Sequence, residues 1–423
     1  MKNFRFLLYH ALFCLLFVGA AEASGFRLPF QSSAAIGKSG ANVASATGPD
    51  CSYFNPANMG FQDDQMQIET SVTALSLPSI HYTDSRTALF NGRSEEELFF
   101  FPLVHMVSND LKGFRLGMSL TYPYGLQKQW TQPYPQSFSR TTSLKVVELN
   151  PTISYTYSDI IGIGGGLRLL HSKGKTENVI INPPMAQIGP LTFLRQSSDG
   201  DSTDYGYNLA LSLRPVPSWT IAATYRSAVT LGLAGESTLE AGVGAEHLAY
   251  LTASSLDIEA PAVTTVATSW QWRQWTVELA WDRTYWSDVT SFDTDFQMDV
   301  TGTPFQSFEQ PIAKNWQDSD SFRLGFTYAY SFSLRFMAGI YIEETPVPEQ
   351  TLGFELPDGD VLGYSAGISY RFSELVELSF SYLYHDVDER TILASQGSQN
   401  TTVDGSFTEA CAHVMNASLT WRF

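Results

Sequence analysis

The sequence predicts an all-β membrane protein: a 14-stranded antiparallel transmembrane β-barrel plugged by its own N-terminal hatch. Three observations lead to this fold class. From Gln65 onward the chain consists of segments of roughly ten residues in which apolar and polar residues alternate. The connections between these segments are alternately very short and very long. After residue 23 there is no uninterrupted run of about 18 apolar residues, so no membrane-spanning helix is expected in the mature chain.

Residues 1–23 have the pattern of a secretory signal peptide. Lys2 and Arg5 precede an apolar run over residues 7–20, and the run is followed by the small-x-small sequence Ala21-Glu22-Ala23. A retained membrane helix is the alternative, but the run is too short for a span. The mature chain is therefore expected to start at Ser24.

Residues 24–64 are predicted to form the hatch. This segment is rich in Gly, Ala, Ser and Asn and shows little alternation. A barrel of fourteen strands is too wide for its own side chains to fill, so a separate plug is needed. The stretch FNPANMG, residues 54–60, carries a rigid Asn-Pro break beside Cys51, and Pro56 would fix one turn of a compact plug.

Residues 65–423 are predicted to form the barrel with long extracellular loops. In the last segment Met415, Leu419 and Phe423 fall on one face, while Asn416 and Thr420 fall on the other. An apolar face towards lipid and a small, polar face towards the lumen are typical of such barrels, whereas an edge strand of a secreted β-sandwich is the alternative. The expected strands are 65–77, 97–107, 113–122, 142–157, 160–172, 203–214, 219–232, 256–271, 274–287, 320–330, 333–343, 361–372, 375–386 and 410–423.

Composition narrows the function. The net charge of −18 argues against nucleic acid as a partner. The histidines and cysteines show no metal-ligand spacing and no nucleophile motif is present, so we expect no enzyme activity, no cofactor and no metal. Whether Cys51 and Cys411 form a disulfide is left open.

Several motifs, in order along nearly the whole mature chain, resemble the FadL family of outer-membrane channels for hydrophobic compounds. They are SGF at 24–26, Asn55-Pro56-Ala57, TYPYGL at 121–126, NPTISY at 150–155, GIGGGLRLL at 162–170, and ETPVPEQ with LPDGD at 344–350 and 356–360. The resemblance implies a monomeric channel in the bacterial outer membrane that takes up long-chain fatty acids or neutral hydrocarbons. Its expected partners are a hydrophobic ligand, outer-membrane lipid and lipopolysaccharide, and the barrel-assembly machinery during biogenesis.

The resemblance also implies a route through the channel. Ligand would be captured at extracellular loops and released sideways where the third strand bends inward beside Asn55, Pro56 and Ala57. The bend maps to Pro123 and Gly125, because a proline gives no ladder hydrogen bond and a glycine tolerates close approach. Asn55 would satisfy the freed backbone groups. The alternative is that Pro-Tyr-Gly simply begins a loop.

A capture groove is predicted between the loops 173–203 and 233–257. Apolar residues there follow no clear strand or helix period, and exposed apolar clusters indicate binding, although they could also pack a private loop core. The residues proposed to line the groove are Ile181, Met185, Ile188, Leu191, Phe193, Leu248 and Tyr250.

The substrate class remains open at this point. Family members that take fatty acids hold the carboxylate with basic residues, and the corresponding positions, near Asn178 and 317–319, are not basic. Lys173, Lys175 and Lys314 lie nearby and could substitute. Without such a cation a neutral hydrophobe becomes plausible, since an unpaired buried carboxylate is costly. The competing function is a general or adhesive outer-membrane barrel without selective hydrophobe transport.

Overall fold

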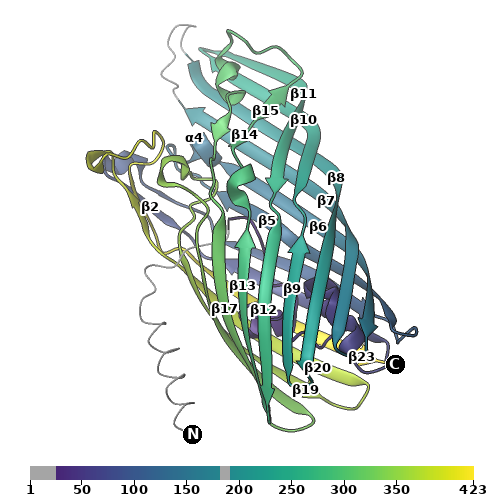
Figure 1. The fold of residues 1–423 in the computed structure, drawn as a ribbon. Coiled ribbons are helices and arrows are strands. Elements are labelled where there is room, and N and C mark those ends of the chain that lie inside the picture. The colour runs from purple at the N-terminus through teal and green to yellow at the C-terminus, as the bar shows by residue number, and fades with distance from the viewer. Residues whose placement is uncertain (1–24, 182–190) are drawn as a thin grey trace.

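The computed structural model describes residues 25–181 and 191–423, and the predicted signal peptide lies outside them. The chain forms one closed, tilted β-barrel with the N-terminal segment inside it (Figure 1). The barrel strands are β1 (Gln67–Leu77), β4 (Glu97–Val107), β5 (Phe114–Gln129), β6 (Thr141–Tyr157), β7 (Ile161–Ile181), β8 (Leu191–Val216), β9 (Trp219–Arg226), β10 (Val229–Val243), β11 (Glu246–Ala260), β12 (Val263–Trp272), β13 (Trp275–Thr284), β17 (Ser319–Ala329), β18 (Leu334–Glu343), β19 (Val361–Arg371), β20 (Val376–Val387) and β23 (Cys411–Arg422).

Two pairs of these segments are halves of single strands. β9 runs into β10 and β8 pairs with both of them, while β11 runs into β12. The wall is therefore fourteen strands around, as predicted, and it closes where β1 pairs with β23 on one edge and with β4 on the other. Closure leaves no bare strand edge along the seam, which hydrocarbon would not tolerate.

The predicted boundaries are wrong on one side of the barrel. The segments 173–203 and 233–257, expected as loops, are mostly strand: β7 continues to Ile181, β8 starts at Leu191, and β10 and β11 form a hairpin around residues 244–245. The outer face of these extensions carries polar residues such as Lys173, Lys175 and Asp199, and part of the inner face is apolar, so the lipid-facing pattern of apolar outside and polar inside is absent. The part of a strand that extends beyond the membrane therefore leaves no clear hydropathy signal in the sequence.

The two faces of the wall have opposite polarity. On β20 the outward-facing Leu378 and Phe380 are about half exposed, whereas the inward-facing Glu377, Ser379 and Ser381 are buried. Lipid-facing apolar residues thus alternate with lumen-facing polar residues, as expected for a transmembrane barrel. The described residues contain no helix that is both long and apolar enough to cross a membrane.

The hatch consists of short helices linked by irregular chain. They are α2 (Ser33–Gly37), α3 (Cys51–Phe54) and the 3₁₀ helix η1 (Pro56–Phe61). The Glu278 carboxylate on β13 accepts hydrogen bonds from three consecutive backbone N–H groups, those of Val43, Ala44 and Ser45, at 2.6–3.0 Å. Glycines on the wall make room for the hatch, since a Cβ on Gly339 would lie 2.3 Å from the hatch backbone.

A cap of small elements closes the extracellular end. It contains α4 (Gln136–Ser139), the four-stranded sheet β2 (His81–Asp84), β3 (Gly92–Arg93), β21 (Arg390–Ile392) and β22 (Gly405–Thr408), and the short strands β14 (Ser291–Phe292), β15 (Thr294–Phe296) and β16 (Ile312–Ala313). Short 3₁₀ turns join them: η2 (Ala88–Phe90), η4 (Trp286–Asp288), η5 (Pro304–Phe308), η6 (Glu349–Thr351) and η7 (Ala394–Gln396). The Trp130 indole donates to the Phe354 carbonyl at 2.8 Å within an aromatic cluster. This cluster ties the cap over the barrel mouth.

Candidate functional site

The strand β5 parts from its neighbour β4 partway along its length. The ladder joins only Val104–Val107 of β4 to Gly117–Leu120 of β5, although both strands continue beyond it. On the opposite edge of β5, the ladder with β6 skips Tyr122 and Pro123. Pro123 has no backbone donor, so an interruption at this position costs the ladder little. The wall is thus opened beside the residue that the sequence singled out.

The first residues of the hatch satisfy the backbone that β5 frees. The N–H of Leu28 donates to the carbonyl of Pro123 at 2.8 Å, and the N–H of Gly125 donates to the carbonyl of Phe26 at 3.0 Å. The Gln31 amide binds both the N–H and the carbonyl of Tyr122, each at 2.8 Å. Residues 26–31 therefore replace a β-strand partner at a place where unpaired groups would be costly.

Asn55 does not have the role we expected for it. Its amide donates to the Val43 carbonyl and to the Ser212 hydroxyl, both at 2.9 Å, and its oxygen accepts from the N–H of Ala57. Pro56 and Ala57 pack on β7, where a Cβ on Gly164 would lie 2.7 Å from the Ala57 nitrogen. The Asn-Pro-Ala turn is thus buttressed by the glycine-rich part of β7, and the prediction that Asn55 satisfies the bent strand is wrong.

The separation of β4 and β5 is closed again at its extracellular end. The N–H of Glu95 donates to the carbonyl of Gln129 at 2.9 Å, and just below it the Lys128 ammonium lies 3.4 Å from the Glu97 carboxylate. Both side chains of this ion pair are nearly fully buried. The stretch between these two closures, residues 97–103 of β4 facing residues 121–128 of β5, is called the wall window below.

A cavity of about 560 Å³, called the main cavity below, lies behind the wall window and reaches into it. Its inner part is lined by apolar residues of the hatch and of β1, such as Leu28, Phe30 and Leu75. Its lining also includes neighbouring residues on the two faces of β4, among them Phe101 and the outward-facing Phe100, which is 64% exposed. The cavity therefore extends from the barrel interior to the outer surface of the wall.

Among the described residues, each cationic side chain that points into the main cavity forms an ion pair with a carboxylate. Arg27 lies 3.1 Å from Asp282, and Lys128 is paired with Glu97 across the wall window. Lys145 also borders the cavity, but its side chain is exposed on the outer face of β6. The interior of the cavity is thus close to electrically neutral.

One acid at the roof of the cavity has no cationic partner within ion-pairing distance among residues 25–181 and 191–423. Asp358 lies in the loop that joins β18 to β19, is buried, and accepts a hydrogen bond from the Thr345 hydroxyl at 2.6 Å. Burial raises the pKa of this carboxyl from 3.8 to about 7, although the Thr345 hydrogen bond opposes the rise. Asp358 therefore changes charge close to neutral pH.

The cations suggested from the sequence lie elsewhere. Lys173 and Lys175 are exposed on the outer face of β7, and Lys314 is buried in an ion pair with Glu355. Geometry therefore leaves none of the three free to receive a ligand carboxylate inside the barrel. Lys128, which sequence reasoning missed, is the inward lysine at the wall window.

The proposed groove residues divide into two groups. Leu191 is buried in a compact apolar cluster with Leu194 and Phe296. This fits the alternative that these segments pack against each other in a small core of their own. Ile181, Leu248 and Tyr250 are exposed, at 38–47%, and Phe193 packs on His247 with ring centroids 5.8 Å apart. Met185 and Ile188 lie outside the described residues.

The two cysteines that the structure describes, Cys51 and Cys411, are both free thiols. Cys51 is buried in α3 and its sulfur accepts a hydrogen bond from the Gln62 amide, while Cys411 lies at the main cavity. The polar neighbourhood of Cys51 belongs to the hatch, where Asp50 accepts hydrogen bonds from Ser32 and Asn42. The thiol beside the Asn-Pro break is a packing element of the plug.

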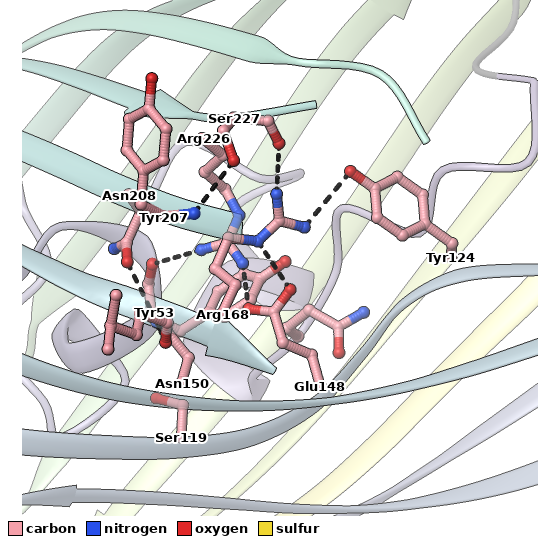
Figure 2. A network of polar contacts seen from close by, with 12 residues as sticks. Tyr53, Ser119, Tyr124, Glu148, Asn150, Arg168, Tyr207, Asn208, Arg226 and Ser227 are labelled. Atoms are coloured by element: carbon pink, nitrogen blue, oxygen red, sulfur yellow. Dashed lines mark hydrogen bonds and ion pairs between the residues drawn. The ribbon is translucent and has the colours of Figure 1, made fainter. Parts of the chain in front are cut away.

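A buried ionic network lies behind the bent strand (Figure 2). Arg168 on β7 donates to Glu148 at 2.9 Å, to the Ser227 carbonyl at 2.5 Å and to the Tyr124 hydroxyl at 3.4 Å. The Tyr124 hydroxyl in turn donates to the Pro261 carbonyl at 3.1 Å. One guanidinium thus connects the bent strand β5 with the two places where a barrel strand is split in half.

Comparison with known proteins gives one family. Its model, described as outer membrane protein transport protein (OMPP1/FadL/TodX), matches residues 14–423. Among curated proteins, the long-chain fatty acid transport protein of Salmonella typhi is 25% identical over 326 residues, which is 67% of this chain and 69% of that protein.

Solved structures share the fold. A Pseudomonas aeruginosa FadL homologue has a TM-score of 0.80 at 18% identity, covering 94% of this chain and 99% of that one. The Pseudomonas putida toluene transporter TodX has a TM-score of 0.71 at 17% identity, covering 95% of this chain and 99% of that one. At these identities the likeness shows the barrel architecture alone.

Proposed function

Because this chain belongs to the OMPP1/FadL/TodX family of outer-membrane transport proteins, which are channels and not enzymes, we propose that it carries neutral hydrophobic small molecules across the outer membrane and releases them sideways through the wall window. The observation that carries the proposal is the main cavity, whose lining crosses the wall between β4 and β5. A solute in the cavity can leave through that wall only where the ladder is missing.

The pathway needs no energy source. An apolar solute gains about 0.8 kcal/mol for each methylene that moves from water into an apolar phase, so the membrane itself draws the solute from the cavity. The window can stay open because residues 26–31 of the hatch satisfy the backbone of β5. Without them the exposed groups would pull the strand back onto β4.

The charge pattern favours a neutral substrate. The Salmonella typhi relative is named for long-chain fatty acids and the Pseudomonas putida structure for toluene. In this chain Lys128 and Arg27 are already paired with carboxylates, so a ligand carboxylate would have to displace Glu97 or Asp282 from its partner. Asp282 would keep Arg323 as a partner, but Glu97 would be left buried and unpaired, which is costly, and a hydrocarbon avoids that cost.

The experiment compares two tryptophan variants in uptake of a radiolabelled alkane and a fatty acid. Gly125→Trp fills the wall window, because even a Cβ there would lie 3.1 Å from the Leu28 side chain. Ala338→Trp is the matched control, since Ala338 faces outward on β18 within unbroken ladders. We expect alkane uptake by wild-type cells, its loss in Gly125→Trp, and normal uptake in Ala338→Trp.

Two outcomes would overturn the proposal. Normal alkane uptake in Gly125→Trp would show that release does not use the wall window. Uptake of the fatty acid but not of the alkane by wild-type cells would overturn the neutral substrate class and leave the channel itself intact. Mass spectrometry of lipophilic molecules extracted from the purified protein gives an independent check of the class.

A further inference from the structure

The barrel wall is interrupted a second time, between β8 and β10. β8 pairs with β10 from Leu191 to Asp201 and with β9 from Asn208 to Val216. Within these fully described strands, residues 202–207 have no ladder partner in β9 or β10, and residues 227–233 have none in β8. On its other edge β8 stays paired with β7 throughout this stretch, so the strand itself is intact.

The network in Figure 2 sets the lower end of this interruption. The carbonyl of Ser227 is turned to the Arg168 guanidinium, so it is engaged inside the barrel. The N–H of Tyr207 instead donates to the Ser227 hydroxyl at 3.0 Å, and the N–H of Ser227 donates to the Tyr207 carbonyl at 2.9 Å. A side chain thus replaces the last ladder carbonyl, and beyond it the two strands run unpaired.

The unpaired stretch is apolar inside and aromatic outside. Val229, Leu231 and Leu233 on β10 are buried with at most 5% exposure, and they face the barrel interior. Outside, Tyr205 is 74% exposed and Tyr207 is 47% exposed. Below the interruption β8 has Asn208–Val216, which is about the 9–11 residues that cross a membrane, so the tyrosines lie near the outer interface.

A second, smaller cavity of about 80 Å³ lies behind this stretch. Gly200 of β8 and Leu233 and Gly235 of β10 line it at the upper end of the interruption. Leu126 and Leu144 line both this cavity and the main cavity. An apolar path therefore leads from the interruption to the main cavity, and Leu233, which lies over Gly174 of β7, narrows it.

We propose that the interruption between β8 and β10 is a second lateral opening, through which neutral apolar solutes dissolved in the outer leaflet reach the main cavity. Val229, Leu231 and Leu233 form its gate, and solute passes when these side chains move aside. At the level of the outer interface, water and lipid headgroups satisfy the unpaired backbone, which the hydrocarbon core would not do. The direction of travel rests on the proposed function, whereas the opening itself does not.

The first test measures access from the lipid. In a background that carries Cys51→Ala and Cys411→Ser, Leu231→Cys and Leu383→Cys are reconstituted in nanodiscs and treated with a pyrene maleimide dissolved in the lipid. Both leucines are fully buried and face inward, but Leu383 lies within unbroken ladders of β20. We expect Leu231→Cys to react at least about ten times faster, because a group behind an intact ladder reacts only after local unfolding. Equal labelling rates for the two variants would overturn the proposal that the wall is open between β8 and β10.

A third variant tests whether the maleimide reaches the introduced thiol of Leu231→Cys through the wall window instead. Gly125→Trp is added to Leu231→Cys, and the labelling rate is measured again. An unchanged rate supports access between β8 and β10, while loss of labelling would show that the reagent came through the other window and would overturn the proposal. Because labelling requires no transport, this result is independent of the release route proposed above.

The second test measures use of the opening. Gly232→Trp places an indole on the outer side of the interruption, where a Cβ meets no atom closer than 3.5 Å. We expect uptake of an alkane supplied in lipid vesicles to fall several-fold, with normal uptake in Ala338→Trp. Fast labelling of Leu231→Cys combined with normal uptake in Gly232→Trp would overturn the role of the opening as a route.

Discussion

The wall from β13 through β17, β18, β19, β20, β23 and β1 to β4 is regular, whereas the wall from β4 through β5 to β10 is interrupted twice. In the regular half every ladder runs the length of its strands. That half also fixes the hatch by side chains, for example Glu278 to residues 43–45 and Ser381 to Ser33. The interrupted half is also contacted by hatch side chains, such as Gln31 and Asn55, but it differs in that Phe26 and Leu28 bind β5 through backbone hydrogen bonds.

The difference shows how a barrel can be opened without a bare edge. In the hydrocarbon core a ladder can be removed only where another part of the protein takes over its hydrogen bonds, because lipid tails offer none. At β5 the substitute is the start of the hatch, and at the lower end of the interruption between β8 and β10 it is the Ser227 hydroxyl with Arg168. The regular half serves as the rigid frame that keeps both substitutes in place.

The largest expected effect comes from removing Arg168. Arg168→Leu leaves the buried Ser227 carbonyl without its donor and leaves Glu148 with Arg226 as its remaining cation. Removing one partner of a buried ion pair costs about 3–5 kcal/mol when the remaining charge is left unpaired. Because Glu148 keeps Arg226, we expect the free energy of unfolding in detergent, measured by guanidinium titration, to fall by about 3 kcal/mol, the lower end of that range.

Arg195→Leu is the matched control for this change. Arg195 also bridges two carboxylates, Glu177 and Glu240, but its side chain is 39% exposed in the extracellular extension. An exposed ion pair contributes only about 0–1 kcal/mol. If both variants lost the same stability, the network behind the interrupted wall would have no special part in holding it.

Prediction from the sequence succeeded where the membrane imposes a pattern. The alternation of Met415, Leu419 and Phe423 with lumen-facing polar residues located β23, since lipid selects the outward face. It failed where strands leave the membrane, as at β8, because the outer face then meets water and carries polar residues. It also failed for Phe26 and Leu28, because backbone hydrogen bonds to β5 leave no mark on side-chain identity.

The candidate site was predicted only in part for the same reason. Pro123 and Gly125 carry a local signal, since their backbone properties are unusual whatever surrounds them. The pairing of Lys128 with Glu97 depends on the register of two strands and on the irregularity at Tyr122 and Pro123, which the sequence does not specify. The sequence pattern therefore favours lysines nearer to the family positions, namely Lys173, Lys175 and Lys314.

A second prediction concerns the place where the two halves meet at the cavity roof. Asp358, in a loop of the regular half, has a pKa of about 7 when folded and about 3.9 when unfolded. The folded state therefore holds its proton more tightly, so the contribution to stability is full below pH 4 and is lost as the pH rises to about 7. Asp358→Asn should remove this loss of stability with rising pH.

The measurement is the thermal midpoint of the wild type and Asp358→Asn between pH 4 and pH 8. We expect the difference in favour of the variant to grow as the pH rises through this range and to level off above about pH 7. Asp386→Asn is a control, since this acid lies at the end of β20 and is exposed. Parallel curves for the wild type and Asp358→Asn would show that burial does not shift this group.

The smallest expected effect tests the electrical neutrality of the interrupted half. Glu97→Gln keeps the shape of the side chain but leaves the Lys128 ammonium beside the main cavity without its carboxylate. A fatty-acid carboxylate could then pair with Lys128, and a gain of about tenfold in affinity corresponds to about 1.4 kcal/mol. Binding of an alkane of the same chain length should not change, because it makes no charged contact.

The measurement is a titration of both ligands against the wild type, Glu97→Gln and the double variant Glu97→Gln with Lys128→Met. It shows whether a gain in fatty-acid affinity depends on Lys128. The double variant should lose the gain, and a gain that persists without Lys128 would place the carboxylate elsewhere in the barrel.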